Sequence, residues 1–377
     1  MKGSVYKQSN GTWAYVLDVG YIDGKRKQKR KKGFRTQKDA NAALSEFKRN
    51  FSQNYLVDSK GITVGKYLDQ WITSHAATVS RSTLVSYQSV IKYQLSMLSD
   101  NLLEDLNPFI IQSFYTKLLE KDYSPTSVNY AHRILKMALA QAVKWKLIPF
   151  NPTDAVETPK KAHIETETLT IDEIDQLKNF IRENNLDYYI PFMIAVTTGM
   201  RRGEIAALEW SDINFENGRI YVSRAMKKID KEIEISAPKN KSSYRSIGMT
   251  NSLMDILKNW KVTQMENRIR YGQYYSDNFI SGKKRNFICT YENGKAIHLD
   301  YYSRALNKAI KELKIDKHVR FHDLRHTHAT LLLEQNVEAK IVQDRLGHSN
   351  ISTTMDLYSH VTKNAQNHAV DKLNEIL

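Results

Sequence analysis

The chain has little of what a secreted, disulfide-bonded or membrane-spanning protein needs. Cys289 is the only cysteine in 377 residues, so neither an intramolecular disulfide nor a cysteine-based metal site can form. The longest strongly apolar run, residues 188–196, is too short to span a bilayer. The first residues lack the apolar segment of a signal peptide. These absences predict a soluble protein of a reducing, intracellular compartment, with no membrane partner.

Acidic residues are too few to balance the basic ones. Against 56 Lys and Arg stand 41 Asp and Glu, which gives a formal net charge of +15. Residues 1–50 alone hold 13 Lys/Arg and 4 Asp/Glu, a net charge of +9. This balance favours a polyanionic partner, nucleic acid before membrane. The alternative is a solvated basic surface or a disordered tail, but interleaved Trp13, Tyr15 and Phe34 favour a folded module.

Periodicity predicts a multidomain α+β protein of three blocks. The first, residues 1–56, contains an alternating strand at 12–22, a hairpin turn at Asp23-Gly24 and a helix that begins at Thr36. A small β-sheet backed by one helix fits this pattern. A run of basic residues lies on the expected returning strand and is the candidate DNA-binding set of this block: Lys25, Arg26, Lys27, Lys29, Arg30, Lys31 and Lys32.

The second block, residues 62–158, is expected to be all helix. Helices begin at Asn107-Pro108 and at Ser124-Pro125, each with a capping residue followed by a first-turn proline. Pro149 and Pro152 are expected to stop the last helix. Apolar residues at helical spacing predict the core: Val64, Tyr67, Leu68, Trp71 and Ile72, then Leu84, Tyr87 and Ile91, then Val128, Ala131, Ile134, Leu135 and Ala138.

The third block, residues 165–377, follows a polar stretch at 153–166 that lacks periodicity and predicts a linker. Thr170 and Glu173 form a capping box at the start of its first helix. The block is mixed but mainly helical, with a β-hairpin or small sheet over residues 220–249. Helices resume after residue 298. The last one, at residues 368–377, could dock on a neighbouring protomer.

A fixed order of basic groups ahead of one tyrosine carries the chemical signal. Taken singly, each has an ordinary alternative: an arginine on a helix surface, a lysine in a solvated turn, a tyrosine in a core. The order along the chain is Arg201 in TTGMRRGEI, Lys239 in SAPKNKSSYRSI, His322 and Arg325 in HDLRHTHAT, His348 in LGHS, and Tyr358 in TTMDLYSHV.

These residue types suit attack on a phosphodiester. The non-bridging oxygens gain negative charge, and two planar guanidinium groups, Arg201 and Arg325, can clamp them. A tyrosine hydroxyl has a reference pKa near ~10, so forming the phenolate at pH 7 costs roughly 4 kcal/mol. A cationic pocket lowers that cost for Tyr358, and His322 can accept the proton.

The remaining members have complementary roles. Lys239, expected at a hairpin tip, can protonate the leaving 5′ oxygen of DNA, with Lys241 as the alternative lysine. His348 can hydrogen-bond a phosphate oxygen. Glu204, one helical turn beyond Arg201, is expected to orient the pocket.

The six motifs in this order resemble the tyrosine recombinase (phage integrase) family, closely over residues 165–365. Residues 1–56 and 62–158 resemble, more loosely, the arm-binding and core-binding domains of integrases from phages and integrative conjugative elements. The resemblance implies a site-specific DNA recombinase that integrates or excises a mobile element through a 3′-phosphotyrosyl intermediate, with no metal, ATP or other cofactor.

The resemblance also implies the partners. These are double-stranded DNA with core and arm attachment sites and a homotetramer on synapsed DNA, in the bacterial cytoplasm or nucleoid. An excision factor or a host DNA-bending protein remains open as a further partner. The chain departs from many relatives in having Lys239-Asn240 for Lys-Thr and Ile247-Gly248 for Ile-Pro.

Other functions remain to be weighed. A type IB topoisomerase-like strand-swivelling enzyme shares the basic groups, but the basic N-terminal block argues against it. A non-catalytic DNA-binding regulator predicts losses among the six positions, and all six are filled. A two-metal nuclease needs converging carboxylates, whereas Glu204 and Asp323 are isolated. His326 and His328 beside His322 lack an acidic or cysteine partner at fitting spacing.

Overall fold

The structure is a computed structural model. It describes residues 3–9, 11–22, 25–54, 61–160, 167–184, 186–230, 232–237, 244–280, 282–351 and 355, with the backbone alone for 18–22, 25–29, 47–54 and 186. Two compact units divide the chain between His163 and Ile164. Each is described by itself.

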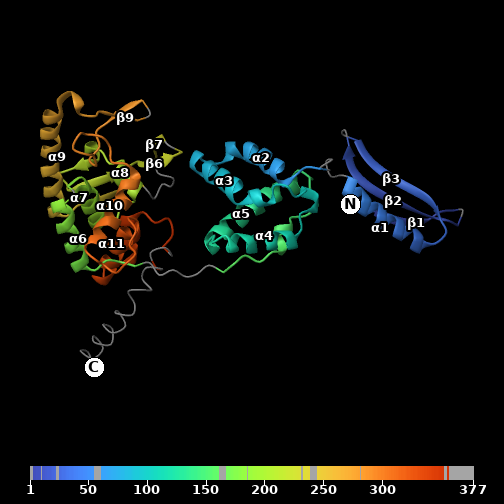
Figure 1. The fold of residues 1–377 in the computed structure, drawn as a ribbon. Coiled ribbons are helices and arrows are strands. Elements are labelled where there is room, and N and C mark those ends of the chain that lie inside the picture. The colour runs from blue at the N-terminus through green and yellow to red at the C-terminus, as the bar shows by residue number, and fades with distance from the viewer. Residues whose placement is uncertain are drawn as a thin grey trace. The chain divides into compact units, whose positions relative to one another are not determined.

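The N-terminal part of the first unit is a three-stranded antiparallel sheet with one helix on it (Figure 1). Tyr15, Leu17 and Leu44 form the buried cluster between sheet and helix. Thr36 caps the helix by accepting a hydrogen bond from the Asp39 amide. The small sheet backed by a helix is therefore confirmed, while the Asp23-Gly24 turn lies outside the described residues. The elements are β1 (Gly3–Lys7), β2 (Trp13–Ile22), β3 (Lys25–Phe34) and α1 (Gln37–Asn54).

The basic run lies on the edge strand β3, which pairs with β2. Arg30, Lys31 and Lys32 are exposed. Tyr15, the cross-strand neighbour of Lys31, is buried. The strand therefore carries its positive charge on a folded sheet with an apolar cluster rather than on a loose tail.

The rest of the first unit is a helical bundle, as expected. The first and last of the predicted apolar stripes are buried, whereas Leu84, Tyr87 and Ile91 are half-buried at the edge of the core. The elements are α2 (Val64–His75), η1 (Ala76–Thr78), α3 (Arg81–Tyr93), η2 (Leu95–Leu98), η3 (Leu103–Asp105), α4 (Pro108–Glu120), α5 (Pro125–Lys144) and η4 (Pro152–Ala155).

Two boundaries differ from the sequence-based expectation. Helix α5 ends at Lys144, before either proline, because Lys146 takes a left-handed conformation with φ 59°. Residues 153–160 are not a free linker. Thr153 is buried, and the Asn129 side chain donates a hydrogen bond to the Pro159 carbonyl at 2.8 Å. Side-chain contacts from the bundle, which the sequence pattern does not reveal, hold this polar segment.

The second unit has one large hydrophobic core, to which α7 (Leu186–Thr198) and α10 (Leu299–Glu312) contribute many of the buried residues. The Thr170–Glu173 capping box is confirmed by reciprocal hydrogen bonds of 2.7 and 3.2 Å. The helices are α6 (Ile171–Asn184), α7 (Leu186–Thr198), α8 (Arg202–Ala206), η5 (Trp210–Asp212), α9 (Asn251–Tyr271), η7 (Gly272–Tyr274), α10 (Leu299–Glu312), α11 (Asp323–Glu334) and α12 (Ala339–Leu346).

The expected β-hairpin and small sheet over residues 220–249 are confirmed: among the described residues, β6 and β7 pair as an antiparallel hairpin, β4, β5 and β8 form a three-stranded sheet, and β9 and β10 form a further pair outside this range. Because β7 pairs with β6 and β8 pairs with β5, the segment between β7 and β8 joins two sheets. Lys239, expected at a hairpin tip, lies with the rest of residues 238–243 outside the described residues. The strands are β4 (Ile213–Asn214), β5 (Arg219–Val222), β6 (Ala225–Ile229), β7 (Glu232–Ser236), β8 (Arg245–Gly248), β9 (Asn278–Ile280) and β10 (Lys283–Arg285).

None of the helices in the described part of the chain is both long enough and apolar enough to cross a membrane. The expected helix at residues 368–377 lies outside the described residues.

Gly203 is a test of how tightly α8 packs on β6. A Cβ built there would lie 2.6 Å from the Met226 carbonyl oxygen. Gly203→Ala should lower the free energy of unfolding by about 1–3 kcal/mol, since a fixed backbone oxygen must move. Gly248→Ala is the matched control because nothing lies within 4 Å of its added Cβ. Urea unfolding measures both, and equal stabilities for the two variants would show that this contact is not tight.

Candidate active site

The structure brings four of the six sequence-predicted residues together in the second unit. Arg201 precedes α8, His322 and Arg325 lie at the start of α11, and His348 follows α12. Lys239 and Tyr358 lie outside the described residues. The basic set from Lys25 to Lys32 lies on β3 of the first unit.

Two helix ends meet at this site, and a left-handed glycine terminates each of them. Gly199 follows α7 with φ 65°, and Gly347 ends α12 with φ 70°. A Cβ on Gly199 would lie 2.5 Å from Leu346 and 2.7 Å from the His328 ring. Only glycine allows both this conformation and this approach. The Thr-Gly and Leu-Gly elements of the motifs thus bring the two helix ends into contact.

The carbonyl groups at these helix ends hold the clamp arginines. Arg325 donates to the carbonyls of Gly199 at 2.8 Å and Leu346 at 2.7 Å. Arg201 donates to the Gly347 carbonyl at 3.1 Å. Carbonyls at a helix C-terminus carry partial negative charge and lack partners within the helix. The two guanidinium groups are therefore positioned by main-chain oxygen before any phosphate arrives.

Glu204 is the buried carboxylate of the site, and its side chain is 4% exposed. Its oxygens accept hydrogen bonds from the Arg201 amide and guanidinium, both at 2.9 Å. They also accept two from Arg245, at 3.1 and 2.8 Å. Burial acts to raise the pKa of Glu204, but Arg245 and Arg201 outweigh it and hold that pKa below its ordinary value. Glu204 is therefore an ionised carboxylate beside Arg201.

A second layer of contacts lies behind the clamp. Arg345 donates to the Thr197 carbonyl at 3.0 Å and to His328 Nε2 at 3.0 Å. His328 Nδ1 lies 2.8 Å from the Val196 carbonyl. Nδ1 therefore carries the proton and Nε2 accepts from Arg345. These contacts fasten α11, α12 and the end of α7 to one another.

The two histidines of the motifs are neutral at pH 7. Burial, then His326 and Arg325, lower the pKa of His322 to about 4. Burial, then Arg325 and Arg201, lower the pKa of His348 to about 3. The His322 side chain is exposed, so water screens part of the effect of the neighbouring charges. A neutral imidazole can accept a proton, which suits a general base.

Arg325 is the most enclosed cation of the motifs and is 3% exposed. Burial and the charges of Arg201 and Arg245 lower its pKa to about 9. It still carries its charge at pH 7. A bound anion would relieve the repulsion among these three guanidinium groups. The site is thus built to receive negative charge.

Arg245 and Arg345 were missed by reasoning from the sequence alone. A signal was present for Arg245: it stands two residues before Ile247 on β8, so both side chains point to the same, buried face of the strand. An arginine on an inward face needs a partner. For Arg345, nothing local shows that its head group reaches the end of α7.

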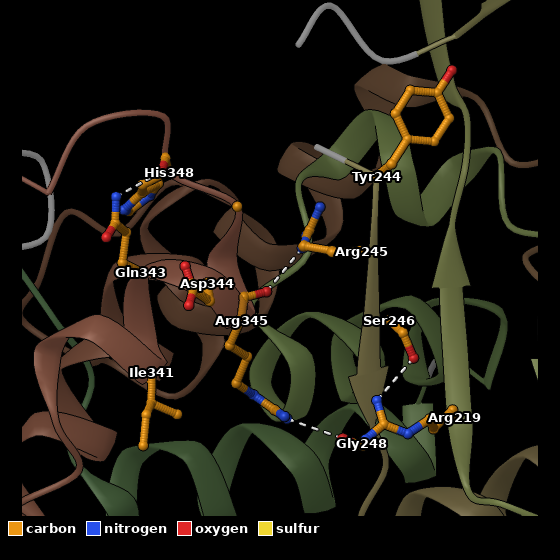
Figure 2. A pocket seen from close by; sticks show the side chains of 11 residues that line it. Arg219, Tyr244, Arg245, Ser246, Gly248, Ile341, Gln343, Asp344, Arg345 and His348 are labelled. Carbon is orange, nitrogen blue, oxygen red and sulfur yellow. Dashed lines mark hydrogen bonds between the residues drawn. The ribbon is translucent and has the colours of Figure 1, made fainter. Parts of the chain in front are cut away.

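A cavity of about 590 Å³ adjoins the site between β8 and α12. Arg245, Arg345 and His348 line this cavity. Figure 2 shows the hydrogen bond that the Arg245 side chain donates to the main-chain oxygen of Arg345. The Gln343 side chain donates to the His348 carbonyl at 3.1 Å, which fixes the turn that carries His348.

Within the described residues, no group of three or more His, Cys, Asp or Glu side chains could hold a metal ion. Asp323 is occupied by two hydrogen bonds of 3.0 Å from the Arg320 guanidinium. The ring of His326 lies edge-on to that of His322, 5.3 Å between centroids. These side chains support the start of α11.

Comparison with known proteins matches each part of the chain to a family. Residues 167–365 match the phage integrase family. Residues 4–51 match an arm DNA-binding domain, and residues 63–164 match a phage integrase SAM-like domain.

Named relatives extend over nearly the whole chain. A XerC-like tyrosine recombinase of Caldanaerobacter subterraneus subsp. tengcongensis is 29% identical over 366 residues, which cover 91% of this chain and 90% of the relative. The ICEBs1 integrase of Bacillus subtilis is 26% identical over 379 residues, covering 99% and 100%.

Solved structures share the fold. The integrase of transposon Tn1549 in complex with a circular intermediate DNA matches with a TM-score of 0.71 and 22% identity, over 83% of this chain and 100% of the other. A lambda integrase tetramer bound to a Holliday junction matches with a TM-score of 0.61 and 20% identity, over 94% of each chain.

The lowered histidine pKa values predict that acid weakens the fold. Burial and Arg345 lower the pKa of His328 to about 4, and the pKa of His348 is lowered to about 3. Between about pH 6.5 and 4 the unfolded chain therefore binds protons that the folded chain does not, and the free energy of unfolding falls as pH falls. Each such proton contributes up to about 1.4 kcal/mol per pH unit. Burial raises the pKa of Asp187 to about 6, so below that pH the folded chain binds a proton that the unfolded chain does not. This proton offsets the contribution of one histidine to the slope.

Urea unfolding of the DNA-free protein at pH 7, 6 and 5 measures this slope. His328→Asn can still donate to the Val196 carbonyl but cannot titrate, so its slope should be shallower. A stability that does not change between pH 7 and 5 would contradict the assignment of these histidines as neutral in the fold.

Proposed function

This chain belongs to the phage integrase family and is a tyrosine recombinase, and we propose that Arg201, Lys239, His322, Arg325, His348 and Tyr358 are its catalytic residues. One observation carries the proposal. Arg201 and Arg325, which come from distant motifs, are anchored on adjacent carbonyls of one helix end, Gly347 and Leu346. Two guanidinium groups held in this way form a preorganised receptor for a phosphate.

In the proposed reaction each of these residues has one role. The Tyr358 hydroxyl attacks the scissile phosphorus, and a 3′-phosphotyrosyl bond forms as the bond to the 5′ oxygen breaks. Neutral His322 accepts the phenol proton, and Lys239 protonates the departing 5′ oxygen. Arg201, Arg325 and His348 bind the non-bridging oxygens, where negative charge grows.

Rejoining is the reverse step on a second strand. A 5′ hydroxyl of the partner duplex attacks the phosphotyrosyl bond and restores the phosphodiester and Tyr358. Because each step exchanges one phosphoester for another, neither ATP nor a metal is needed. As negative charge enters the site, the pKa of His322 rises toward its ordinary value, which favours proton transfer at the moment of attack.

The three blocks divide the binding of double-stranded DNA. Residues 1–56, of which 4–51 match an arm DNA-binding domain, hold arm sites through the basic strand β3. Residues 62–158 hold the core site, and residues 165–377 carry out catalysis. Four protomers act on two synapsed duplexes. The lambda integrase tetramer bound to a Holliday junction supports this part of the proposal.

The biological setting follows from the relatives. The ICEBs1 integrase and the Tn1549 integrase belong by name to mobile elements. We place this protein in the bacterial cytoplasm, on the nucleoid, where it integrates and excises such an element. An excision factor or a host DNA-bending protein would set the direction.

Tyr358→Phe tests the catalytic assignment. It keeps the ring and removes the hydroxyl, so the variant should bind DNA and form no covalent adduct. Denaturing gel electrophoresis of protein incubated with an attachment-site DNA detects the adduct. Tyr274→Phe, at a tyrosine that is 77% exposed, is the control and should keep it. A denaturant-resistant DNA complex formed by the Tyr358 variant would disprove the assignment.

Removal of residues 1–56 tests the role of the basic strand. Each phosphate neutralised adds about 0.9 to the salt slope of binding. The truncated protein should show a flatter salt dependence and no protection of outlying arm sites, yet cleave a short core site at nearly the full rate. Footprinting across a salt series, on a site identified by sequencing covalently trapped fragments, measures this. Equal salt slopes and equal footprints for the full-length and truncated proteins would show that residues 1–56 do not bind arm sites.

A further inference from the structure

We propose that Arg245 is a positioning residue for the cleavage reaction: by saturating Glu204, it keeps the Arg201 guanidinium presented to the phosphate. The inference rests on the proposed function, since it concerns the same site. The Arg245 side chain is 6% exposed and the Glu204 side chain is 4% exposed. The Arg201 side chain, in contrast, is 36% exposed. The pair is thus buried beneath the clamp arginine that reaches the surface.

The donors around Glu204 fill its carboxylate. An ionised carboxylate offers about four lone-pair positions. Oε1 accepts from Arg201 Nη1 at 2.9 Å and from Arg245 Nη1 at 3.1 Å. Oε2 accepts from the Arg201 amide at 2.9 Å and from Arg245 Nη2 at 2.8 Å. The carboxylate therefore has little capacity left for a second bond from the Arg201 side chain.

This saturation matters because arginine and carboxylate prefer a two-bond fork. Arg201 gives Glu204 one terminal nitrogen and Gly347 the other. A guanidinium has five N–H groups, and these two contacts leave others of Arg201 without a protein acceptor among the described residues. If Arg245 were lost, Oε2 would be open to Arg201. The guanidinium would then be drawn toward Glu204 and away from the phosphate.

Arg245 has a second contact that acts in the same direction. Its Nε donates to the Arg345 carbonyl at 2.8 Å (Figure 2). The next two carbonyls, of Leu346 and Gly347, accept from Arg325 and Arg201. Three arginines thus bind three successive carbonyls just before His348. Arg245 holds the first of them and so fixes the turn whose Gly347 carbonyl binds Arg201.

The test is a double-mutant cycle between Arg245→Lys and Arg201→Lys in the full-length protein. The rate of covalent adduct formation at saturating attachment-site DNA is measured separately from the half-saturating DNA concentration. Arg245→Lys keeps the charge but not the fork. It should slow cleavage on the order of 10²-fold, as displacement of a reacting group does, while the half-saturating concentration changes by less than about threefold, because many other phosphate contacts remain.

Non-additivity separates positioning from general damage. If Arg245 acts through Arg201, the double variant should be no slower than Arg201→Lys alone, within about threefold. Losses that multiply in the double variant would overturn the proposal, and so would an Arg245→Lys rate close to that of the unaltered protein.

Control variants guard against misfolding. Arg224 also binds buried carboxylates, Glu209 and Asp212, but contacts no clamp residue. Arg224→Lys should cleave at nearly the full rate, and slowing equal to that of Arg245→Lys would overturn the proposal. Urea unfolding establishes that each variant is folded. If Arg245→Lys does not fold, Arg245→Gln replaces it in the double-mutant cycle with Arg201→Lys, because its side-chain amide can still donate to Glu204.

The Tyr358→Phe result separates the two failures. If that variant still forms the adduct, the proposed catalytic assignment fails. If it forms none while Arg245→Lys cleaves at the full rate, the catalytic assignment stands and the role given to Arg245 fails.

Discussion

The binding of arginine side chains to main-chain carbonyls at two helix ends is the interaction on which the site depends. The ends of α7 and α12 present successive oxygens, and Arg201, Arg245 and Arg325 each donate to at least one of those from Arg345 to Gly347. Neutral carbonyls hold these three cations without cancelling their charge, and the single carboxylate Glu204, paired with Arg201 and Arg245, neutralises only part of it. The site therefore keeps a strong positive potential and a fixed geometry together, which is what a receptor for a phosphate requires.

Burial of so much positive charge has consequences for the rest of the unit. It lowers the pKa of His322 and His348, so the DNA-free site contains neutral imidazoles. It also explains why one buried carboxylate, Glu204, is shared between two guanidinium groups. Residues of α7 and α8 are buried in the large hydrophobic core next to the site, and burial of this apolar surface can offset the cost of holding like charges near one another.

The same physical logic separates binding from chemistry along the chain. The basic strand β3 carries the exposed charges of Arg30, Lys31 and Lys32 on a small sheet, and contacts between exposed charges of this kind and phosphates are screened by salt and independent of sequence. At the candidate site of the second unit, Arg245 and Arg325 are buried, and these two and Arg201 are each anchored by a main-chain carbonyl. The first arrangement suits affinity for DNA, and the second suits stabilisation of one phosphate during reaction.

The sequence by itself determined the small sheet with its helix, the helical second block and the start of α6 at its capping box, because caps and periodicity are local signals. The order of the motifs named Arg201, His322, Arg325 and His348 as a set, and the tertiary structure brings them together. It did not determine that β7 and β8 belong to different sheets, that residues 153–160 are held on the bundle, or that Arg245 and Arg345 complete the site. Strand partners and the reach of a long side chain depend on contacts between residues far apart in the chain. Arg245 lies 41 positions from Glu204 and 100 from Arg345, and only the tertiary structure brings these groups within hydrogen-bonding distance.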